Sequence, residues 1–159
     1  MKKTLFTCLV FVGLIYSSCD NSIPVKERIL KQGSKINLKS TNGNYLCSNW
    51  DMLIYADKEI ASDWEVFLIK ESEDNKYVLQ AHTNKYLSAN LGNDKELESN
   101  RGRASDWEKF DLIEINDSTI ALMASNGKYL SVADDYKLYA VSDTITTSEE
   151  FIVTFLNKK

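Results

Sequence analysis

The phrase NGNYLCS at residues 42–48 returns as TNKYLSA at residues 83–89 and as NGKYLSV at residues 126–132. The tyrosines of the three copies are separated by 41 and 43 residues, and a leucine follows each of them: Tyr45, Tyr86 and Tyr129. A fixed period of this length is typical of chains built from several copies of one supersecondary unit. The sequence therefore predicts three copies of one unit within 159 residues, a length that suits a single domain.

Two further phrases recur in the same order after each tyrosine. The first is LIYA at 53–56, LES at 97–99 and KLYA at 137–140. The second is ASDWEVF at 61–67 and ASDWEKF at 104–110, which agree at six of seven positions. The third copy, ITTSEEF at 145–151, keeps the phenylalanine but has Ser148 where the other copies have tryptophan.

Alternation of apolar and polar residues predicts strands before each tyrosine, at 35–40, 76–82 and 119–125. Tight turns at NGN, TNK and NGK join them to short strands that begin at the tyrosines, since Asn-Gly is a strong hairpin signal. Two more strands follow in each copy. One is a short strand around LIYA, LES or KLYA, and the other is the final strand, at 64–70, 108–115 and 149–156. Helical repeats need longer amphipathic segments, and three blades are too few for a propeller. The pattern predicts an all-β protein, a β-trefoil with three repeats of four strands, a closed six-stranded barrel and a cap of three hairpins.

The three phrases together resemble those of the fascin-like β-trefoil domain over residues 34–159. The resemblance implies a trefoil fold. It does not imply that this chain bundles actin, because fascin uses four such domains, whereas this chain has one such domain behind an export signal. Related single trefoils in bacteria accompany sugar-active proteins, so the resemblance implies a non-catalytic carbohydrate-binding module.

The N-terminus has the layout of a signal peptide. Lys2 and Lys3 precede an apolar run at 5–16, which is short for a membrane span. The following YSSC, residues 16–19, resembles a bacterial lipobox, although Tyr16 stands where most lipoboxes have an aliphatic residue. The resemblance implies a lipoprotein with signal peptide 1–18, lipidation at Cys19, a tether at 19–33 and a lipid anchor in the inner or outer membrane of a bacterial cell envelope. A plain secretory signal cut after Ser18 is the alternative.

Charge and cysteine content narrow the possible partners. Loss of Lys2 and Lys3 lowers the basic residues from 19 to 17 against 23 acidic ones, so the net charge goes from −4 to −6. Nucleic acid is an unfavourable partner for so acidic a domain, because binding it needs clustered cations. Cys47 is the one cysteine left after Cys8 and Cys19, which excludes a disulfide within the mature chain and suggests a small core residue.

The repeated aromatic residues are predicted to form the core, because a threefold core needs the same large side chain three times. They are Tyr45, Tyr86, Tyr129, Trp64, Trp107, Phe67, Phe110 and Phe151. The place of Ser148 in that core must then be filled in some other way.

We expect binding residues where the copies differ. A sugar site needs an aromatic ring for the apolar face of the sugar and carboxylate or amide groups for its hydroxyls. The candidates are Asn49, Trp50 and Asp51 in the first copy, Asp134, Asp135 and Tyr136 in the third, and the loop at 90–94 in the second. Trp50 and Tyr136 follow their tyrosines by five and seven residues, which predicts that they are equivalent aromatic platforms. The competing interpretation is that these side chains only cover the end of the barrel.

Catalysis has little support in the sequence. His82 is the single histidine and has no Ser or Cys partner nearby, and there is no phosphate loop, metal motif or nucleophile elbow. We therefore predict no enzyme, no catalytic residue, no cofactor and no metal. The expected function is that of a monomeric domain that binds a glycan; the alternative is a protein-interaction module, an accessory subunit or an inhibitor, that binds an envelope protein.

Overall fold

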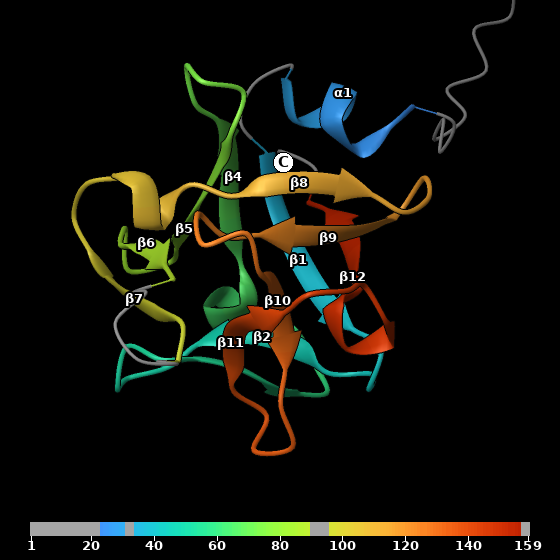
Figure 1. Cartoon of the computed structure of the whole chain (residues 1–159). Helices are drawn as coiled ribbons and strands as arrows, with labels where there is room; N and C mark the ends of the chain where they lie inside the picture. Colours follow the sequence, from blue (N-terminus) through green and yellow to red (C-terminus); the bar gives the residue numbers. More distant parts are fainter. Residues whose placement is uncertain (1–22, 31–33, 90–95, 157–159) are drawn as a thin grey trace, which may run out of the picture.

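The computed structural model describes residues 23–30, 34–89 and 96–156. The predicted signal peptide, Cys19 and the loop at 90–94 lie outside these residues. The described chain consists of twelve strands, one α-helix and three short 3-10 helices (Figure 1). The elements are α1 (Val25–Leu30); β1 (Ser34–Ser40), β2 (Tyr45–Ser48), β3 (Ile54–Lys58), η1 (Asp63–Glu65) and β4 (Phe67–Glu71) of repeat 1; β5 (Tyr77–Ala81), β6 (Tyr86–Ser88), β7 (Glu98–Arg101), η2 (Asp106–Glu108) and β8 (Asp111–Glu114) of repeat 2; and β9 (Thr119–Met123), β10 (Tyr129–Val132), β11 (Leu138–Ser142), η3 (Thr147–Glu149) and β12 (Phe151–Phe155) of repeat 3.

The first and last strand of each repeat form a closed antiparallel barrel. Going around it, β1 pairs with β4, β4 with β5, β8 with β9, β9 with β12 and β12 with β1. The remaining seam between β5 and β8 is closed by Tyr77 and Phe110, whose N–H groups donate to each other's carbonyls at 2.8 and 2.9 Å. Closure leaves no barrel edge open to another chain.

The two middle strands of each repeat form a hairpin, and the three hairpins are hydrogen-bonded to one another. The Ile54 N–H donates to the Leu97 carbonyl at 3.0 Å, and the Leu97 N–H donates to the Leu138 carbonyl at 2.8 Å. All three side chains have no exposed surface. The hairpins therefore share one apolar centre. Together with the barrel they confirm the predicted β-trefoil.

The predicted turns before the tyrosines share one backbone geometry. Gly43, Asn84 and Gly127 occupy the same turn position with φ of 91°, 60° and 76°. This left-handed conformation is available to glycine without strain and is tolerated by asparagine. The phrases NGN, TNK and NGK therefore code for the same turn.

The core confirms the phenylalanines of the predicted set and corrects the other rings. Phe67, Phe110 and Phe151 have no exposed surface. The three tyrosines are only half-buried, because the hairpin register shifts beside each of them and buries the following leucine instead: Leu46, Leu87 and Leu130. The tryptophans are not core residues either, since Trp64 is half-buried and Trp107 is 41% exposed.

The segment predicted as a tether contains a packed helix. Val25 and Ile29 on α1 are 0% and 1% exposed and belong to the core cluster. The Lys26 N–H donates to Glu114 Oε1 at 2.8 Å. Within 19–33, residues 25–30 are therefore part of the domain, because two apolar side chains one helical turn apart face the barrel.

The helix lies at one end of the molecule and the β10–β11 hairpin at the other (Figure 1). Nowhere in the described part of the chain does a helix have the length and apolar character needed to cross a bilayer.

Candidate functional site

A buried glutamate recurs in the turn that precedes the last strand of each repeat. Glu65, Glu108 and Glu149 are 2–3% exposed. Oε2 of Glu65 accepts hydrogen bonds from the backbone N–H and the hydroxyl of Ser62 at 2.6 and 2.7 Å. Thr146 gives Glu149 the same pair of bonds at 2.8 and 2.6 Å. These residues form capping boxes. We missed them in the sequence, although Ser/Thr-x-x-Glu in all three copies is their usual signal.

The other side of each glutamate contacts the residue two positions after the repeated tyrosine. The Ser88 hydroxyl donates to Glu108 Oε1 at 2.6 Å. Cys47 occupies the corresponding position in repeat 1, where burial and a hydrogen bond to Glu65 raise the pKa of its thiol to about 12. A thiol with this pKa is not a nucleophile at neutral pH. Cys47 is therefore structural, as the sequence predicted, and it helps fix the η1 turn to the hairpin.

The η1 turn carries Trp64, whose ring contacts two other rings, those of Trp50 in repeat 1 and of His82 at the end of β5 in repeat 2. The Trp64 ring centroid is 4.4 Å from that of Trp50 and 4.1 Å from that of His82. Trp50 is 82% exposed, so most of its ring is free to contact a ligand. His82 packs against the Trp64 ring on one side.

A shallow cavity of about 340 Å³ lies beside these rings. Its lining combines apolar surface with groups that hydrogen-bond; it consists of Cys47, Asn49, Trp50, Lys58, Ile60, Ser62, Trp64 and Glu65. Predicted residues Asn49 and Trp50 therefore come together here. Trp64 and Ser62 line the same cavity. The sequence predicts Trp64 as a core residue and does not single out Ser62, because both lie in the repeated phrase and the binding residues are expected where the copies differ.

Two of the three predicted aspartates, Asp51 and Asp135, make the same hydrogen bonds in their hairpins. Asp51 accepts hydrogen bonds from the Leu53 N–H at 3.0 Å and the Tyr55 hydroxyl at 2.7 Å. Asp135 accepts the corresponding bonds from the Lys137 N–H and the Tyr139 hydroxyl, both at 3.1 Å. These carboxylates close the hairpin turns and do not line the repeat 1 cavity.

The hydrogen-bond pattern also corrects the equivalence of Trp50 and Tyr136. Tyr136 and Met52 each donate an N–H to the carbonyl three residues earlier, at 2.9 Å, and both have φ of 65°. Tyr136 therefore corresponds to Met52, and Trp50 corresponds to Asp134. The two aromatic side chains are two residues out of register and are not equivalent platforms.

A second hollow, of about 290 Å³, lies between repeat 3 and the β1–β2 turn of repeat 1, near the position equivalent to the Trp64 ring. Ser148 lines it in place of a tryptophan, together with Asp134 and Tyr136. The predicted gap left by Ser148 is thus an open surface hollow and not a core defect. In repeat 2, Trp107 is 41% exposed.

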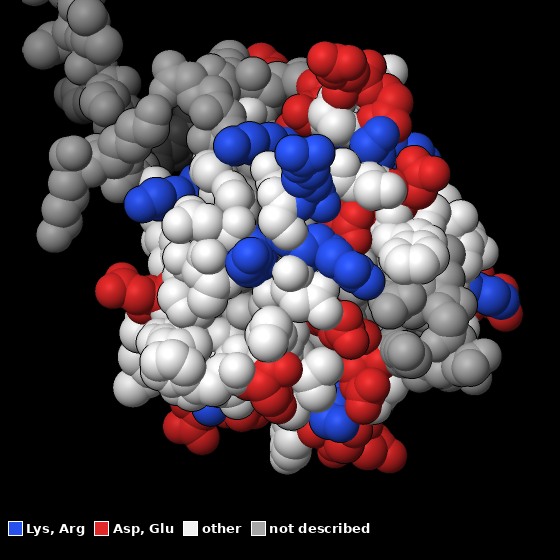
Figure 2. Space-filling view, turned by 90° about the vertical axis from the view of Figure 1, so that its left-hand side faces the viewer, with Lys and Arg blue, Asp and Glu red and all other residues white. Residues whose placement is uncertain are grey.

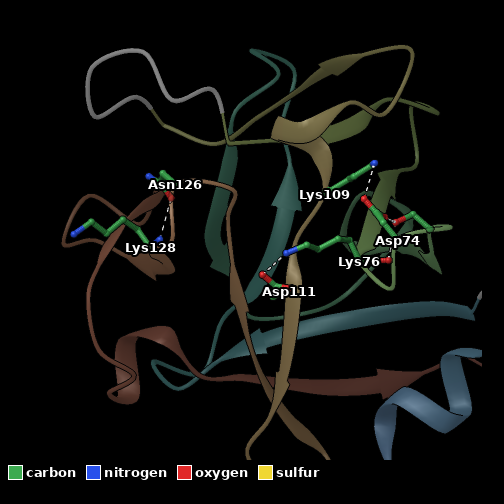
Figure 3. Close-up of polar contacts among 7 residues, drawn as sticks. Asp74, Lys76, Lys109, Asp111, Asn126 and Lys128 are labelled. Atoms are coloured by element: carbon green, nitrogen blue, oxygen red, sulfur yellow. Dashed lines mark hydrogen bonds and ion pairs between the residues drawn. The ribbon is translucent and has the colours of Figure 1, made fainter.

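Two ion pairs join the β4–β5 turn to the η2–β8 segment, away from these hollows. Lys76 Nζ lies 2.5 Å from Asp111 Oδ2, and Lys109 Nζ lies 2.8 Å from Asp74 Oδ2 (Figure 3). The hydrogen bond from Lys109, with another from Ser72, lowers the pKa of Asp74 to about 2. In the described ranges no three His, Cys, Asp or Glu side chains are grouped as metal ligands would be.

Comparison with solved structures shows the fold. The chain is similar to a mosquitocidal holotoxin (14% identity, TM-score 0.70), covering 79% of this chain but only 18% of the toxin. It is similar to the designed threefold-symmetric protein ThreeFoil (15% identity, TM-score 0.69), covering 77% of this chain and 99% of that one. It is also similar to SeviL bound to asialo-GM1 saccharide (18% identity, TM-score 0.62), covering 77% and 98%.

No curated protein matches the sequence. The family described as "Domain of unknown function (DUF7910)" matches residues 78–159, just over half of the chain. The chain belongs to the DUF7910 family.

Proposed function

We propose that this protein is a non-catalytic carbohydrate-binding module, exported and held at a bacterial cell envelope by a lipid on Cys19, and that the cavity beside Trp50 and Trp64 in repeat 1 is its glycan site. The observation that carries the proposal is the 82% exposed Trp50 ring, held 4.4 Å from Trp64 at the edge of a cavity of about 340 Å³. Its fascin-like character stays a prediction from the repeat phrases.

The chemistry of the cavity suits a neutral sugar. A sugar ring has an apolar face of C–H groups, which packs on an aromatic ring, and a rim of hydroxyls that need hydrogen-bond partners. Trp50 offers the ring. The Asn49 amide and the Ser62 hydroxyl line the same cavity and offer donors and acceptors.

The ring is held in place before any ligand arrives. Trp64 supports Trp50 from one side and is itself packed on His82. The buried Glu65 fixes the η1 turn that carries Trp64. A ligand would therefore lose little affinity to the ordering of the site.

The likeness to SeviL, which was solved bound to asialo-GM1 saccharide, supports a glycan as the class of ligand. The same fold occurs in the designed ThreeFoil, so the fold alone does not assign a ligand. The choice of a glycan for this chain rests on the residues of its own cavity.

The lipid anchor is proposed from the sequence, and the position of α1 suits it. Val25 is six positions after Cys19, and a fully extended chain spans at most about 20 Å over six positions. The α1 end would then lie near the membrane, and the β10–β11 hairpin at the opposite end would point away from it (Figure 1). Labelling of whole cells with a radioactive fatty acid tests this part: Cys19→Ser should lose the label and the membrane association.

Glycan-array screening of residues 23–159 tests the binding site. We expect at least one neutral glycan to bind, and Trp50→Ala to weaken that binding about tenfold or more, since an aromatic contact contributes about 1 kcal/mol or more beyond its buried area. Trp107→Ala is the matched control, because it removes an exposed tryptophan of repeat 2 and should leave binding unchanged. Binding that survives Trp50→Ala, with the fold intact by circular dichroism, contradicts the site.

A protein-interaction module is the second candidate, and one observation favours it. Ile60 lines the same cavity and is 81% exposed, so with the exposed Trp50 it forms a small apolar patch that suits an apolar protein contact. Under this alternative no glycan would bind, and both Ile60→Ser and Trp50→Ala would abolish capture of a stable partner from envelope extracts.

A further inference from the structure

Basic side chains gather near the middle of the face that carries β6 and β7, with acidic side chains around them (Figure 2). On the β6–β7 hairpin, Lys85 Nζ lies 3.9 Å from the point where a Cβ on Gly102 would be. Arg101 and Arg103 flank that glycine in the chain, and Arg101 pairs with Tyr86, the neighbour of Lys85. Lys85 thus lies next to Gly102 in space, and Arg101 and Arg103 lie next to it in the chain; we call these three residues the repeat 2 basic cluster.

Comparison with repeat 3 shows what this cluster lacks. Tyr129 pairs with Ser142 as Tyr86 pairs with Arg101, so Lys128 corresponds to Lys85 and Asp143 corresponds to Gly102. Lys128 Nζ forms an ion pair with Asp143 Oδ1; Figure 3 shows Lys128 beside Asn126, to which its backbone N–H also donates. In repeat 2 the acid is replaced by a glycine.

The three cations of the cluster have no internal counterion. Within the described ranges, none of Lys85, Arg101 and Arg103 forms an ion pair, and all three are exposed. Like charges that lie near one another repel unless an anion lies between them. The missing carboxylate of repeat 2 therefore leaves a place for the anionic group of a ligand.

We propose that the repeat 2 basic cluster binds a sulfate or carboxylate group of an anionic polysaccharide, in a second site that is independent of the neutral-glycan site in repeat 1. Guanidinium groups bind such oxyanions through paired N–H donors. The exposed Trp107, four residues after Arg103, offers an aromatic surface for a neighbouring sugar ring.

The surrounding charge favours a thin linear polymer over a bilayer or a nucleic acid. The whole chain carries −4, and acidic side chains lie at several points around the basic ones on this face (Figure 2). A membrane surface or a duplex presents a broad negative field that would meet those acids as well. A single polysaccharide chain can contact the cluster and avoid its acidic margin.

Restoring the missing acid gives the sharpest test. In Gly102→Asp the new Cβ meets only Lys85 Nζ, at an ordinary contact distance, so the variant should fold. Binding of dextran sulfate and of alginate to residues 23–159 is measured by calorimetry, with unsubstituted dextran as the neutral reference. The sulfated and carboxylated polymers show which anionic group is preferred.

We expect at least one of the two polyanions to bind, dextran not to bind, and binding to weaken as salt is added. Gly102→Asp should weaken it by a few-fold, up to about fivefold, since an exposed charge pair is worth up to about 1 kcal/mol. Lys70→Gln changes the net charge by the same amount at an exposed site on β4 and should have no such effect.

Trp50→Ala should leave polyanion binding intact, which separates this proposal from the neutral-glycan site. Three results overturn it: neither polyanion binds, Gly102→Asp and Lys70→Gln behave alike, or duplex DNA or vesicles of phosphatidylcholine with phosphatidylglycerol bind as tightly as the polyanions.

Discussion

Each repeat buries one carboxylate that accepts several hydrogen bonds at the turn before its last strand. In repeat 1 the second partner of this carboxylate is a thiol, whereas repeats 2 and 3 have Ser88 and Ser131 at that position. Cys47 therefore stands where the other two repeats have a hydroxyl donor. This explains a buried lone cysteine without any reactive role.

The exchange of donors at Cys47 can be tested by stability measurements. We expect Cys47→Ser to change the free energy of unfolding by less than about 1 kcal/mol, because a hydroxyl can donate to Glu65 as it does in repeat 2. Cys47→Val, of similar size but without a donor, should cost about 1–3 kcal/mol, because it leaves the buried carboxylate short of a partner. Urea denaturation measures both. Equal losses in the two variants would show that the hydrogen bond to Glu65 is not important.

Glu149 gives the fold a dependence on acid. Burial acts to raise the pKa of its carboxyl, but hydrogen bonds from Thr146, Ser131 and Ser142 outweigh it, so the folded-state pKa lies below the usual 4.5. A lowered folded-state pKa contributes stability that is fully present above the unfolded value and is lost as the pH falls through the folded value.

We therefore expect the urea midpoint to fall between neutral pH and about pH 3, and Glu149→Gln to make that fall shallower. Urea titrations across this range make the comparison. Glu73→Gln, at an exposed position, is the control and should keep the wild-type slope. An unchanged slope in Glu149→Gln would contradict the role of this carboxyl.

At the scale of elements, α1 is the feature that extends the domain beyond the three repeats. Its Val25 and Ile29 side chains are buried, and the Arg28 guanidinium lies 4.3 Å from the centroid of the Phe155 ring on β12. The helix thereby links the start of the chain to the last strand. A helix of six residues is too short to be stable alone, so packing must hold it.

Removal of the buried side chain tests the packing of α1. We expect Ile29→Ala to lower the free energy of unfolding by about 2–5 kcal/mol, the usual cost of a core cavity. Lys26→Ala is the control, because the contact of Lys26 with Glu114 is made by the backbone N–H. A cost for Ile29→Ala no larger than that of Lys26→Ala would show that the segment behaves as the tether that the sequence suggested.

Prediction from the sequence succeeded for the turns and for the buried phenylalanines, and it failed for the other repeated rings. The turns at Gly43 and Gly127 and the buried Phe67, Phe110 and Phe151 follow directly from turn chemistry and apolar periodicity. The tyrosines and tryptophans were placed in the core because they recur, but the register shift in each hairpin turns the tyrosines toward the surface.

The candidate site was found in part. Asn49 and Trp50 do line the cavity, but Trp64 reaches it only because the η1 turn folds back toward the hairpin, and sequence spacing does not show that approach. Repetition was taken as evidence for a core role alone. In this fold a repeated residue can lie at the surface, as Trp64 does where it lines the repeat 1 cavity.

At the scale of the whole molecule, the three repeats share one architecture and carry three different surfaces. Repeat 1 has the Trp50 and Trp64 cavity, repeat 2 has the cluster around Gly102, and repeat 3 has an open hollow at Ser148. The common barrel and the buried glutamates give all three surfaces the same supporting framework. Divergence of function can then proceed in one repeat without loss of the fold.

The most direct test of the account uses the three tryptophans as reporters, because Trp50, Trp64 and Trp107 give one indole N–H signal each in a ¹⁵N correlation spectrum. Signals are assigned with the single alanine variants and followed while the best neutral glycan from the array is added. We predict that the Trp50 and Trp64 signals shift together with one saturation curve and that the Trp107 signal stays in place. A glycan that binds without moving the Trp50 signal, or that moves the Trp107 signal alone, would contradict the proposed site in repeat 1.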